Sequence, residues 1–466
     1  MQKHIFVFAI VFACTQFNLQ SQVLSDSSVI KLNHLVEDFK TKFKIPGISV
    51  SIVHGNETAY SNSLGYTDME SKTPVTIDSR FPIMSITKTF TATMLMQLLE
   101  KGIVKLDDAV TKYVPEYKVQ LASGGISSTT LFQLATHSAG LPRNSPSDVD
   151  FTVSLDKWLL SGGKYSIKWL SSNKELLKSL EYVKLEYPPF HYVHHNDRHY
   201  SNLGYSILGI ALERAAKVEY SKYIVTNICK PLQMMNSGFL NQYNGKTPLA
   251  IGYRYNVITS RSDKLPPFEP HSALYAGGMF STAGDLAKYI SFQFEDDQSI
   301  ASKVLSADNK AMMRFLKLGW KPAFPFVLHE GSIPGYRSII VFHPELKVGW
   351  AILTNSMDVD FNQINGSIAE IVTMTFKKKS TSDLKNYVGT YKLPGGYGSL
   401  KMYLKYDSLY STYLEDFLVG RPLVREGDYR FKVEGKNGYN ISYEFVADED
   451  SKITALKMGQ FVWYKE

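Results

Sequence analysis

The chain has 466 residues, of which 44% are hydrophobic and 20% are charged, and it contains 31 Gly and 19 Pro. This composition supplies enough apolar material for one large core or two domains without disulfide or metal cross-links, and it excludes disordered, collagen-like and coiled-coil chains. The formal net charge is +7, but the basic residues are scattered apart from Lys377–Lys379, whereas a nucleic-acid-binding protein concentrates them in a stripe or a module, so we expect no nucleic-acid partner.

Residues 1–21 are typical of an export signal. Lys3 supplies a positive charge, residues 5–13 form a short apolar run, and polar residues follow. The run is shorter than the roughly 20 apolar residues that a membrane-spanning helix needs, and no later segment supplies such a length. We therefore predict an exported protein, periplasmic or secreted, with no transmembrane span and with cleavage near Ser21.

The chain has two cysteines, and Cys14 lies inside the predicted signal, so no disulfide is expected in the mature protein. Residues 11–14 are similar to a bacterial lipoprotein cleavage site. Phe12 fits such a site poorly, so a lipid anchor at Cys14 is the weaker alternative to cleavage near Ser21.

Residues 22–379 are expected to form one α+β domain. Apolar residues from Val29 to Phe43 recur at three- and four-residue spacing behind a serine-rich start, which predicts an amphipathic helix. Alternating apolar residues at 48–52 then lead through a turn into a second strand at 58–64. This pattern is typical of an antiparallel hairpin.

A second pair of strands is predicted far downstream, at residues 336–342 and 348–353, followed by a helix over 364–375. Residues 85–310 between the two hairpins carry mostly helical patterns. We therefore expect an antiparallel sheet flanked by helices, with a largely α-helical insertion between its halves and a cleft between the two parts.

Ser85 is predicted to lie at the start of a helix whose apolar pattern runs from Phe90 to Leu99. Lys88 follows three residues later on the same helix face, so its amine can reach the hydroxyl of Ser85. A lysine assists a serine nucleophile where burial or nearby positive charge favours its neutral form. Ser-x-x-Lys motifs also arise by chance at solvated helix starts. Partner residues elsewhere in the chain must therefore decide whether this motif is catalytic.

Tyr200 and Asn202 stand two residues apart in a predicted loop before an apolar helix. The phenol can relay a proton between Ser85 and a leaving group, and the amide can hold a substrate carbonyl. Taken alone, the segment would be interpreted as a turn with a packed tyrosine and a capping asparagine.

A third string, residues 329–336, leads into the penultimate strand of the sheet. Gly331 would let a substrate approach the backbone, and the backbone amides of Ser332 and Ser85 can form an oxyanion hole. His329 alone would be interpreted as a structural histidine. The three strings in this order, in these secondary-structure settings, favour one shared catalytic site.

Together the strings resemble those of the class C β-lactamase and penicillin-binding-protein-like serine hydrolases. The resemblance covers roughly residues 32–376 and is strengthened by the segments Leu134–Pro142, Pro231–Met234 and Ala276–Thr282. It implies a β-lactamase/transpeptidase-like fold for residues 22–379.

The resemblance also implies roles for individual residues in an acyl-enzyme mechanism. Ser85 would be the nucleophile, with Lys88 and Tyr200 as proton-transfer partners. Asn202 would orient the substrate, and the amides of Ser85 and Ser332 would stabilise the oxyanion. No metal or cofactor is implied.

The third string departs from the β-lactamases of this class, which resemble Lys-Thr-Gly at that position. His329-Glu330-Gly331 is similar to the His-x-Gly form of family aminopeptidases and esterases. A neutral His329 attracts a substrate carboxylate less strongly than a lysine does, which argues against efficient β-lactam hydrolysis or recognition of a C-terminal D-alanine.

The long interval from Leu141 to Tyr200 is rich in aromatic residues, and we expect it to cover the cleft or to pack a core of its own. Several histidines in this interval have a spacing that fits no known ligand pattern, so no metal site is predicted. They are His191, His194, His195 and His199.

Residues 384–466 carry short alternating strands and predict a small all-β, barrel-like domain. It resembles the lipocalin-like domain often attached to these hydrolases. Such a domain can bind a ligand, contact a partner or border the catalytic cleft, and the last role is preferred. The six predicted strands span residues 387–391, 400–404, 409–413, 429–433, 441–445 and 453–458.

The preferred function is therefore an exported serine hydrolase that cleaves an amide or ester through an acyl-enzyme on Ser85. Its substrate would be a small molecule or peptide, either a peptide containing D-residues or a small ester. One alternative is a β-lactamase or a D-alanyl-D-alanine carboxypeptidase. Another is a non-catalytic protein of the same fold that binds peptidoglycan or peptides. The oligomeric state is left open.

Overall fold

The computed structural model describes residues 24–121, 123–189, 199–243, 245, 248–294, 303–323, 325–376, 384–394, 399–405, 408–412, 422–427, 429–434, 440–458 and 461–466. Several features named in the sequence lie outside these residues. They are the predicted export signal with Cys14, Lys377–Lys379, and three histidines, His191, His194 and His195.

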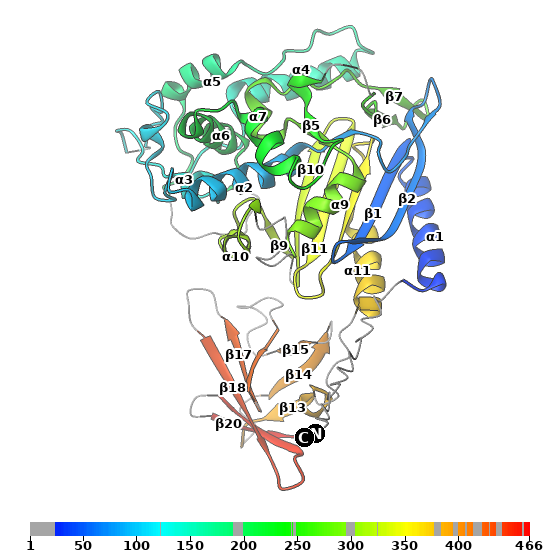
Figure 1. Cartoon of the computed structure of the whole chain (residues 1–466), viewed down its shortest axis with the longest axis vertical. Coiled ribbons are helices and arrows are strands. Elements are labelled where there is room, and N and C mark those ends of the chain that lie inside the picture. Colours follow the sequence, from blue (N-terminus) through cyan, green and yellow to red (C-terminus); the bar gives the residue numbers. More distant parts are fainter. Residues whose placement is uncertain are drawn as a thin grey trace, which may run out of the picture.

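A seven-stranded antiparallel sheet in the order β3-β2-β1-β12-β11-β10-β9 forms the centre of the larger part of the molecule (Figure 1). The two predicted hairpins meet at its middle, where Ile52 of β1 lies opposite Trp350 of β12. The strands are β1 (Gly47–His54), β2 (Glu57–Asp68), β3 (Thr73–Pro74), β9 (Lys321–Ala323), β10 (Phe326–Ile333), β11 (Tyr336–His343) and β12 (Val348–Thr354).

The central strands are buried on both faces, which explains their nearly continuous apolar sequences. Ile339 and Val341 of β11 pack on the side of α1 (Asp26–Lys42) and α11 (Asn362–Phe376). Ile340 and Phe342 belong to the other core, on the side of α2 and α9. The alternation follows from the two-residue period of a strand.

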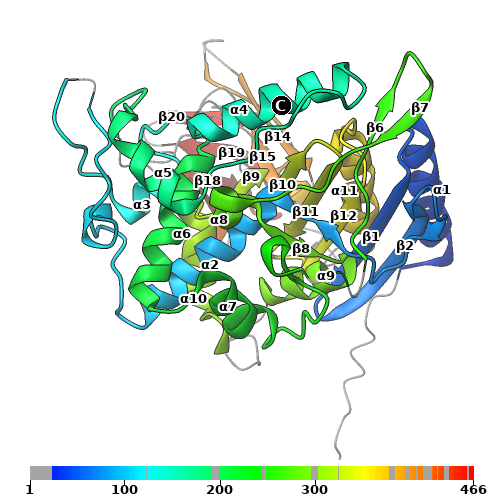
Figure 2. The same cartoon turned by 90° about the horizontal axis from the view of Figure 1, so that it is seen from above.

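A largely α-helical segment is inserted between β3 and β9, as the sequence predicts. Figure 2 shows α2, which contacts α6, α8 and α10, near the centre of this helical segment. Its helices are α2 (Thr87–Glu100), α3 (Leu131–Ala135), α4 (Pro146–Leu160), α5 (Asn173–Ser179), α6 (Asn202–Ala216), α7 (Tyr220–Ile224), α8 (Leu274–Gly277), α9 (Ala283–Phe292) and α10 (Ala307–Phe315).

The chain between β3 and β9 also contains short strands that the sequence patterns do not predict. β4 (Phe81–Pro82) and β5 (Gly238–Phe239) both pair with β8 (Met279–Ser281). A separate hairpin consists of β6 (Tyr253–Asn256) and β7 (Arg261–Lys264).

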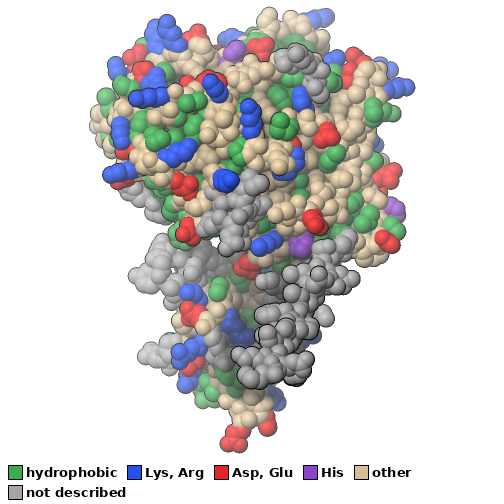
Figure 3. Space-filling view, in the orientation of Figure 1, with side chains coloured by type: hydrophobic (Ala, Val, Ile, Leu, Met, Phe, Trp, Pro, Cys, Tyr) green, Lys and Arg blue, Asp and Glu red, His purple; other side chains and the backbone are tan. Residues whose placement is uncertain are grey.

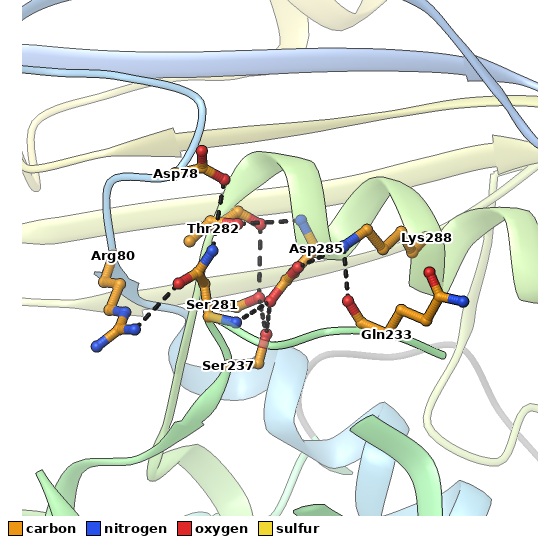
Figure 4. Close-up of polar contacts among 9 residues, drawn as sticks. Asp78, Arg80, Gln233, Ser237, Ser281, Thr282, Asp285 and Lys288 are labelled. Atoms are coloured by element: carbon orange, nitrogen blue, oxygen red, sulfur yellow. Dashed lines mark hydrogen bonds and ion pairs between the residues drawn. The ribbon is translucent and has the colours of Figure 1, made fainter. Parts of the chain in front are cut away.

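A buried carboxylate fixes this small sheet to α9 (Figure 4). Asp285 is 2% exposed and accepts hydrogen bonds from the backbone N of Asn236 at 2.7 Å and from Ser237 Oγ at 2.9 Å. Its other oxygen lies 3.1 Å from Lys288 Nζ. Because β4 leads directly to the segment that contains Ser85, the network helps to hold that segment in place.

Residues 384–466 form an eight-stranded antiparallel sheet in the order β15-β14-β13-β20-β19-β18-β17-β16. The N–H of Leu423 donates to Leu409 O at 2.7 Å and joins the two edges, so the sheet is nearly closed into a barrel. The strands are β13 (Gly389–Lys392), β14 (Ser399–Lys405), β15 (Ser408–Ser411), β16 (Val424–Gly427), β17 (Arg430–Glu434), β18 (Asn440–Ala447), β19 (Ile453–Met458) and β20 (Phe461–Lys465).

Two of these strands, β16 and β20, are missing from the sequence-based expectation. Side chains pack the interior of the barrel, including Tyr391, Met402 and Phe445, which are at most 3% exposed.

The surface agrees with the scattered charge of the sequence, because Lys, Arg, Asp and Glu side chains intermingle over the face in Figure 3. Among the residues that the structure describes, no helix combines the length and apolar character needed to cross a membrane.

Candidate active site

Ser85 lies in a one-turn 3-10 helix, η1 (Met84–Ile86), immediately before α2. The preceding residue, Ile83, is held from two sides: its N–H donates to Met279 O at 3.0 Å, and Ser338 Oγ donates to its carbonyl at 2.9 Å. Met84 has a φ of 49°, a left-handed conformation that few residues other than glycine adopt and that occurs often at functional sites. The turn leaves Ser85 half-buried between buried neighbours.

Lys88 is completely buried, and its amine contacts the Ser85 hydroxyl. Its Nζ lies 3.1 Å from Ser85 Oγ, 2.8 Å from Asn202 Oδ1 and 2.7 Å from Ala276 O. A neutral amine has two N–H donors and one lone pair. The oxygens of Asn202 and Ala276 can accept from both donors. The lone pair then faces Ser85 Oγ, as a base requires.

The surroundings of Lys88 favour this neutral form. Burial is the largest cause that lowers the pKa of Lys88 well below its usual value, and the positive charges of Arg143 and Lys321 lower it further. The carboxyl group of Asp148 acts in the opposite direction. From the sequence, a neutral Lys88 required burial or nearby positive charge, and the structure has both.

Tyr200 is 8% exposed and lies beside the Ser85–Lys88 pair. The centre of its ring is 4.9 Å from Lys88 Nζ, 5.0 Å from Arg143 Cζ and 5.5 Å from Lys321 Nζ. Positive charge therefore lies near this phenol from the loop after α3 and from β9, and also from α2 when Lys88 holds a proton.

Asn202 is the first residue of α6 rather than part of the preceding loop, and Ser201 is the N-cap. Its Oδ1 accepts from Lys88, and its Nδ2 donates to Asn144 Oδ1 at 2.7 Å. The amide therefore orients Lys88 directly. Its predicted contact with a substrate carbonyl remains a prediction.

The third string is itself a strand, β10, that packs against η1. β9 pairs with Phe326–Leu328, so the edge of β10 from His329 onwards is turned towards the Ser85 segment. A Cβ on Gly331 would lie 2.2 Å from Ile83 O, so only glycine fits without displacement. Ser332 follows with an exposed side chain, and its predicted oxyanion role remains a prediction.

His329 is 2% exposed, and the centre of its ring is 6.4 Å from that of Tyr200. Burial is the largest cause that holds the pKa of His329 well below its usual value, and Lys88 in its protonated form and the charge of Lys321 lower it further. The histidine is therefore neutral, which is the form assumed in the sequence analysis.

Sequence reasoning missed several residues that the structure places at this site: His137, Arg143, Asn144 and Lys321. The first three lie in or next to Leu134–Pro142, a segment noted only for its resemblance. Lys321 is the first residue of β9, and no local sequence pattern distinguishes it from a surface lysine.

The aromatic-rich interval before Tyr200 forms a small core next to the site. Phe151 and Leu155 of α4 pack with Leu170, and Ile333 at the end of β10 joins them. The segment therefore packs a core of its own, as one of the two expectations held, and this core reaches the end of β10. That the segment covers the cleft remains a prediction. His199 contacts Tyr187, with ring centres 4.2 Å apart.

A profile of the family described as Beta-lactamase matches residues 32–373. The chain belongs to the Beta-lactamase family. Its fold and family are those of β-lactamase-related serine hydrolases.

Proteins similar to this Beta-lactamase family member come from organisms as different as Dictyostelium discoideum, Staphylococcus aureus and Pyrococcus abyssi. Beta-lactamase-like protein 2 of Dictyostelium discoideum is 28% identical over 322 residues, which cover 66% of this chain but only 55% of that protein. Protein flp of Staphylococcus aureus (strain NCTC 8325 / PS 47) is 25% identical, with 79% of this chain and 71% of that protein covered. The octameric penicillin-binding protein homologue from Pyrococcus abyssi is 26% identical, with a TM-score of 0.63 and coverage of 94% of this chain and 100% of that chain.

Proposed function

We propose that this protein is an exported serine hydrolase that cleaves an amide or ester bond through an acyl-enzyme on Ser85. The observation that carries the proposal is the buried amine of Lys88, 3.1 Å from Ser85 Oγ and 2.8 Å from Asn202 Oδ1. A surface Ser-x-x-Lys motif would leave the amine solvated and charged, whereas this amine is completely buried and lies near the positive charges of Arg143 and Lys321.

In the proposed reaction, Ser85 Oγ attacks the substrate carbonyl carbon and its proton passes to the neutral amine of Lys88. The carbonyl oxygen becomes negative between η1 and β10, where the amides of Ser85 and Ser332 would stabilise it. The bond to the leaving amine or alcohol then breaks, and a proton reaches the leaving group through Tyr200. Water hydrolyses the resulting ester, which releases the acid and restores Ser85.

The cations around Tyr200 support a function for this phenol in proton transfer. Negative charge develops on its oxygen whenever its proton moves towards the leaving group. Arg143, Lys321 and Lys88, once Lys88 has taken the proton of Ser85, lie within 4.9 to 5.5 Å of the ring, and their positive charge stabilises that state.

The same cations favour a second candidate, a D-alanyl-D-alanine carboxypeptidase or a β-lactamase. The neutral His329 offers a substrate carboxylate no charge, but Arg143 is exposed and Lys321 is partly exposed beside Tyr200. A carboxylate on the leaving group would therefore meet positive charge from these two residues. We propose that the amide substrates are peptides with a free C-terminal carboxylate after a D-residue.

The proposal is tested by reaction with a fluorophosphonate probe, followed by mass spectrometry of the labelled peptide. We expect an adduct on Ser85 and none in Ser85→Ala. Turnover of D-alanyl dipeptides, short-chain esters and a chromogenic cephalosporin then separates peptidase, esterase and β-lactamase activity. Failure of every probe in folded protein, with ligand binding retained in Ser85→Ala, would instead support the non-catalytic alternative. Sequencing the N-terminus of secreted protein tests export.

A further inference from the structure

His137 lies in the loop after α3, next to the turn that carries the proton-transfer residues. Its Nδ1 accepts a hydrogen bond from the backbone N–H of Ser201 at 3.1 Å. Its ring centre is 4.4 Å from that of Tyr200 and 5.0 Å from that of Tyr205. The backbone adopts a φ of 59° at this residue, a conformation in which His is enriched among non-glycine residues.

The bonded N–H belongs to the peptide unit between Tyr200 and Ser201. The hydrogen bond to His137 therefore fixes the orientation of this peptide unit and of the adjoining Cα atom from which the Tyr200 side chain projects. The next residue is fixed by the same loop, since the N–H of Asn202 donates to Arg143 O at 2.7 Å and Ser201 Oγ donates to Pro142 O at 2.7 Å. A short loop thus sets the directions of both Tyr200 and Asn202.

We propose that His137 is a positioning residue of the hydrolase and that its neutral imidazole aligns Tyr200 and Asn202 with Lys88. The inference rests on the proposed function of Ser85 and adds a residue that does not itself touch the substrate. A protonated Nδ1 carries a hydrogen and cannot accept from Ser201, so acid would release the turn.

The charged and titratable groups around His137 oppose its protonation. They are Lys88 from α2, Arg143 from its own loop, Lys321 from β9 and His329 from β10, while Tyr200 and Tyr205 supply the neutral aromatic walls. Burial is the largest cause that holds the pKa of His137 well below its usual value. Lys88 and His329 in their protonated forms, and the charges of Lys321 and Arg143, lower it further. The hydrogen bond therefore persists at neutral pH and is lost only in acid.

Two amide variants separate positioning from packing. In His137→Asn the side-chain oxygen can occupy the place of Nδ1 and accept from Ser201, whereas in His137→Gln the oxygen lies one bond further along. We expect kcat on a neutral ester to fall about 100-fold in His137→Gln with little change in KM, because a misplacement of about 1 Å costs that much. His137→Asn should recover most of this loss and should remain active at lower pH than the wild type.

The fluorophosphonate reaction of Ser85 is measured in parallel from pH 5 to 8, with circular dichroism to confirm folding. Equal kcat and equal pH profiles in the wild type and both variants would overturn the role of His137 while leaving Ser85 established. Equal losses in both variants with an unshifted pH profile would reduce His137 to a packing residue and also overturn it. No adduct in the wild type would overturn the proposed function and this inference together.

Discussion

Gly331 and Ile83 are in direct backbone contact: a Cβ on Gly331 would lie 2.2 Å from Ile83 O and 2.3 Å from Ser338 Oγ. Ile83 stands two residues before Ser85, so the contact sets the distance between the nucleophile segment and the edge of β10. The central sheet therefore forms one wall of the site and does not merely support it.

Gly331→Ala should push the edge of β10 away from the segment that contains Ser85. We expect kcat/KM on a short-chain ester to fall about 100-fold, because the oxyanion donors on η1 and β10 would no longer converge. Gly366→Ala in α11 is the matched control, since its added Cβ would meet no atom within 4 Å apart from its own stretch of helix backbone. That variant should keep its activity and gain up to about 1 kcal/mol of stability. Wild-type kcat/KM in Gly331→Ala would contradict the proposed geometry.

Lys88→Met removes the amine but keeps an unbranched side chain in the buried position. We expect kcat to fall about 1000-fold, because Ser85 loses its proton acceptor. Lys310→Met is a control for burial alone, as Lys310 is 1% exposed and donates to Phe292 O at 3.0 Å. It should lose stability in thermal unfolding but keep kcat. Similar activity in the two variants would remove Lys88 from the mechanism.

The cations beside Tyr200 predict discrimination between charged and neutral leaving groups. The measured quantity is the ratio of kcat/KM for a D-alanyl-D-alanine substrate to that for its C-terminal amide. We expect this ratio to fall about tenfold in Arg143→Gln and again in Lys321→Gln, because each removes one charge near the leaving-group carboxylate. A ratio near one in the wild type would exclude carboxylate recognition by these residues.

Local periodicity was sufficient to predict the frame of the fold and the first part of the site. The helix at Asp26–Lys42, both hairpins and the Ser85–Lys88 pair follow from spacing along the chain. β16 was missed because Val-Arg-Glu-Gly carries no alternation.

The remaining site residues come from tertiary contacts that no local pattern encodes. Lys321 reaches Tyr200 only because β9 pairs with β10, and His137 acts through the backbone of a residue far along the chain. Asn202 was recognised as functional, but its bond to Lys88 depends on how α6 packs against α2.

Buried histidines predict that the protein loses stability in mild acid. Burial lowers the pKa of His343 from 6.5 to about 4, and it lowers the pKa values of His137 and His329 in the same direction. The unfolded chain therefore binds more protons than the folded chain below pH 6.5. For His343 this difference extends down to about pH 4, so the free energy of unfolding must fall as the pH decreases through this window.

Each such group contributes at most about 1.4 kcal/mol per pH unit, so urea unfolding at pH 7, 6 and 5 should give a fall of about 3–6 kcal/mol in total. Asp148 offsets part of this fall, because burial raises its pKa and the folded chain therefore binds this proton more readily than the unfolded chain does. His343→Asn isolates one contribution away from the active site, since its amide oxygen can still accept the N–H of Leu346 that His343 Nδ1 binds at 3.3 Å. This variant should show a shallower dependence of unfolding free energy on pH. A flat wild-type profile between pH 7 and 5 would mean that these imidazoles take up protons equally well in the folded protein.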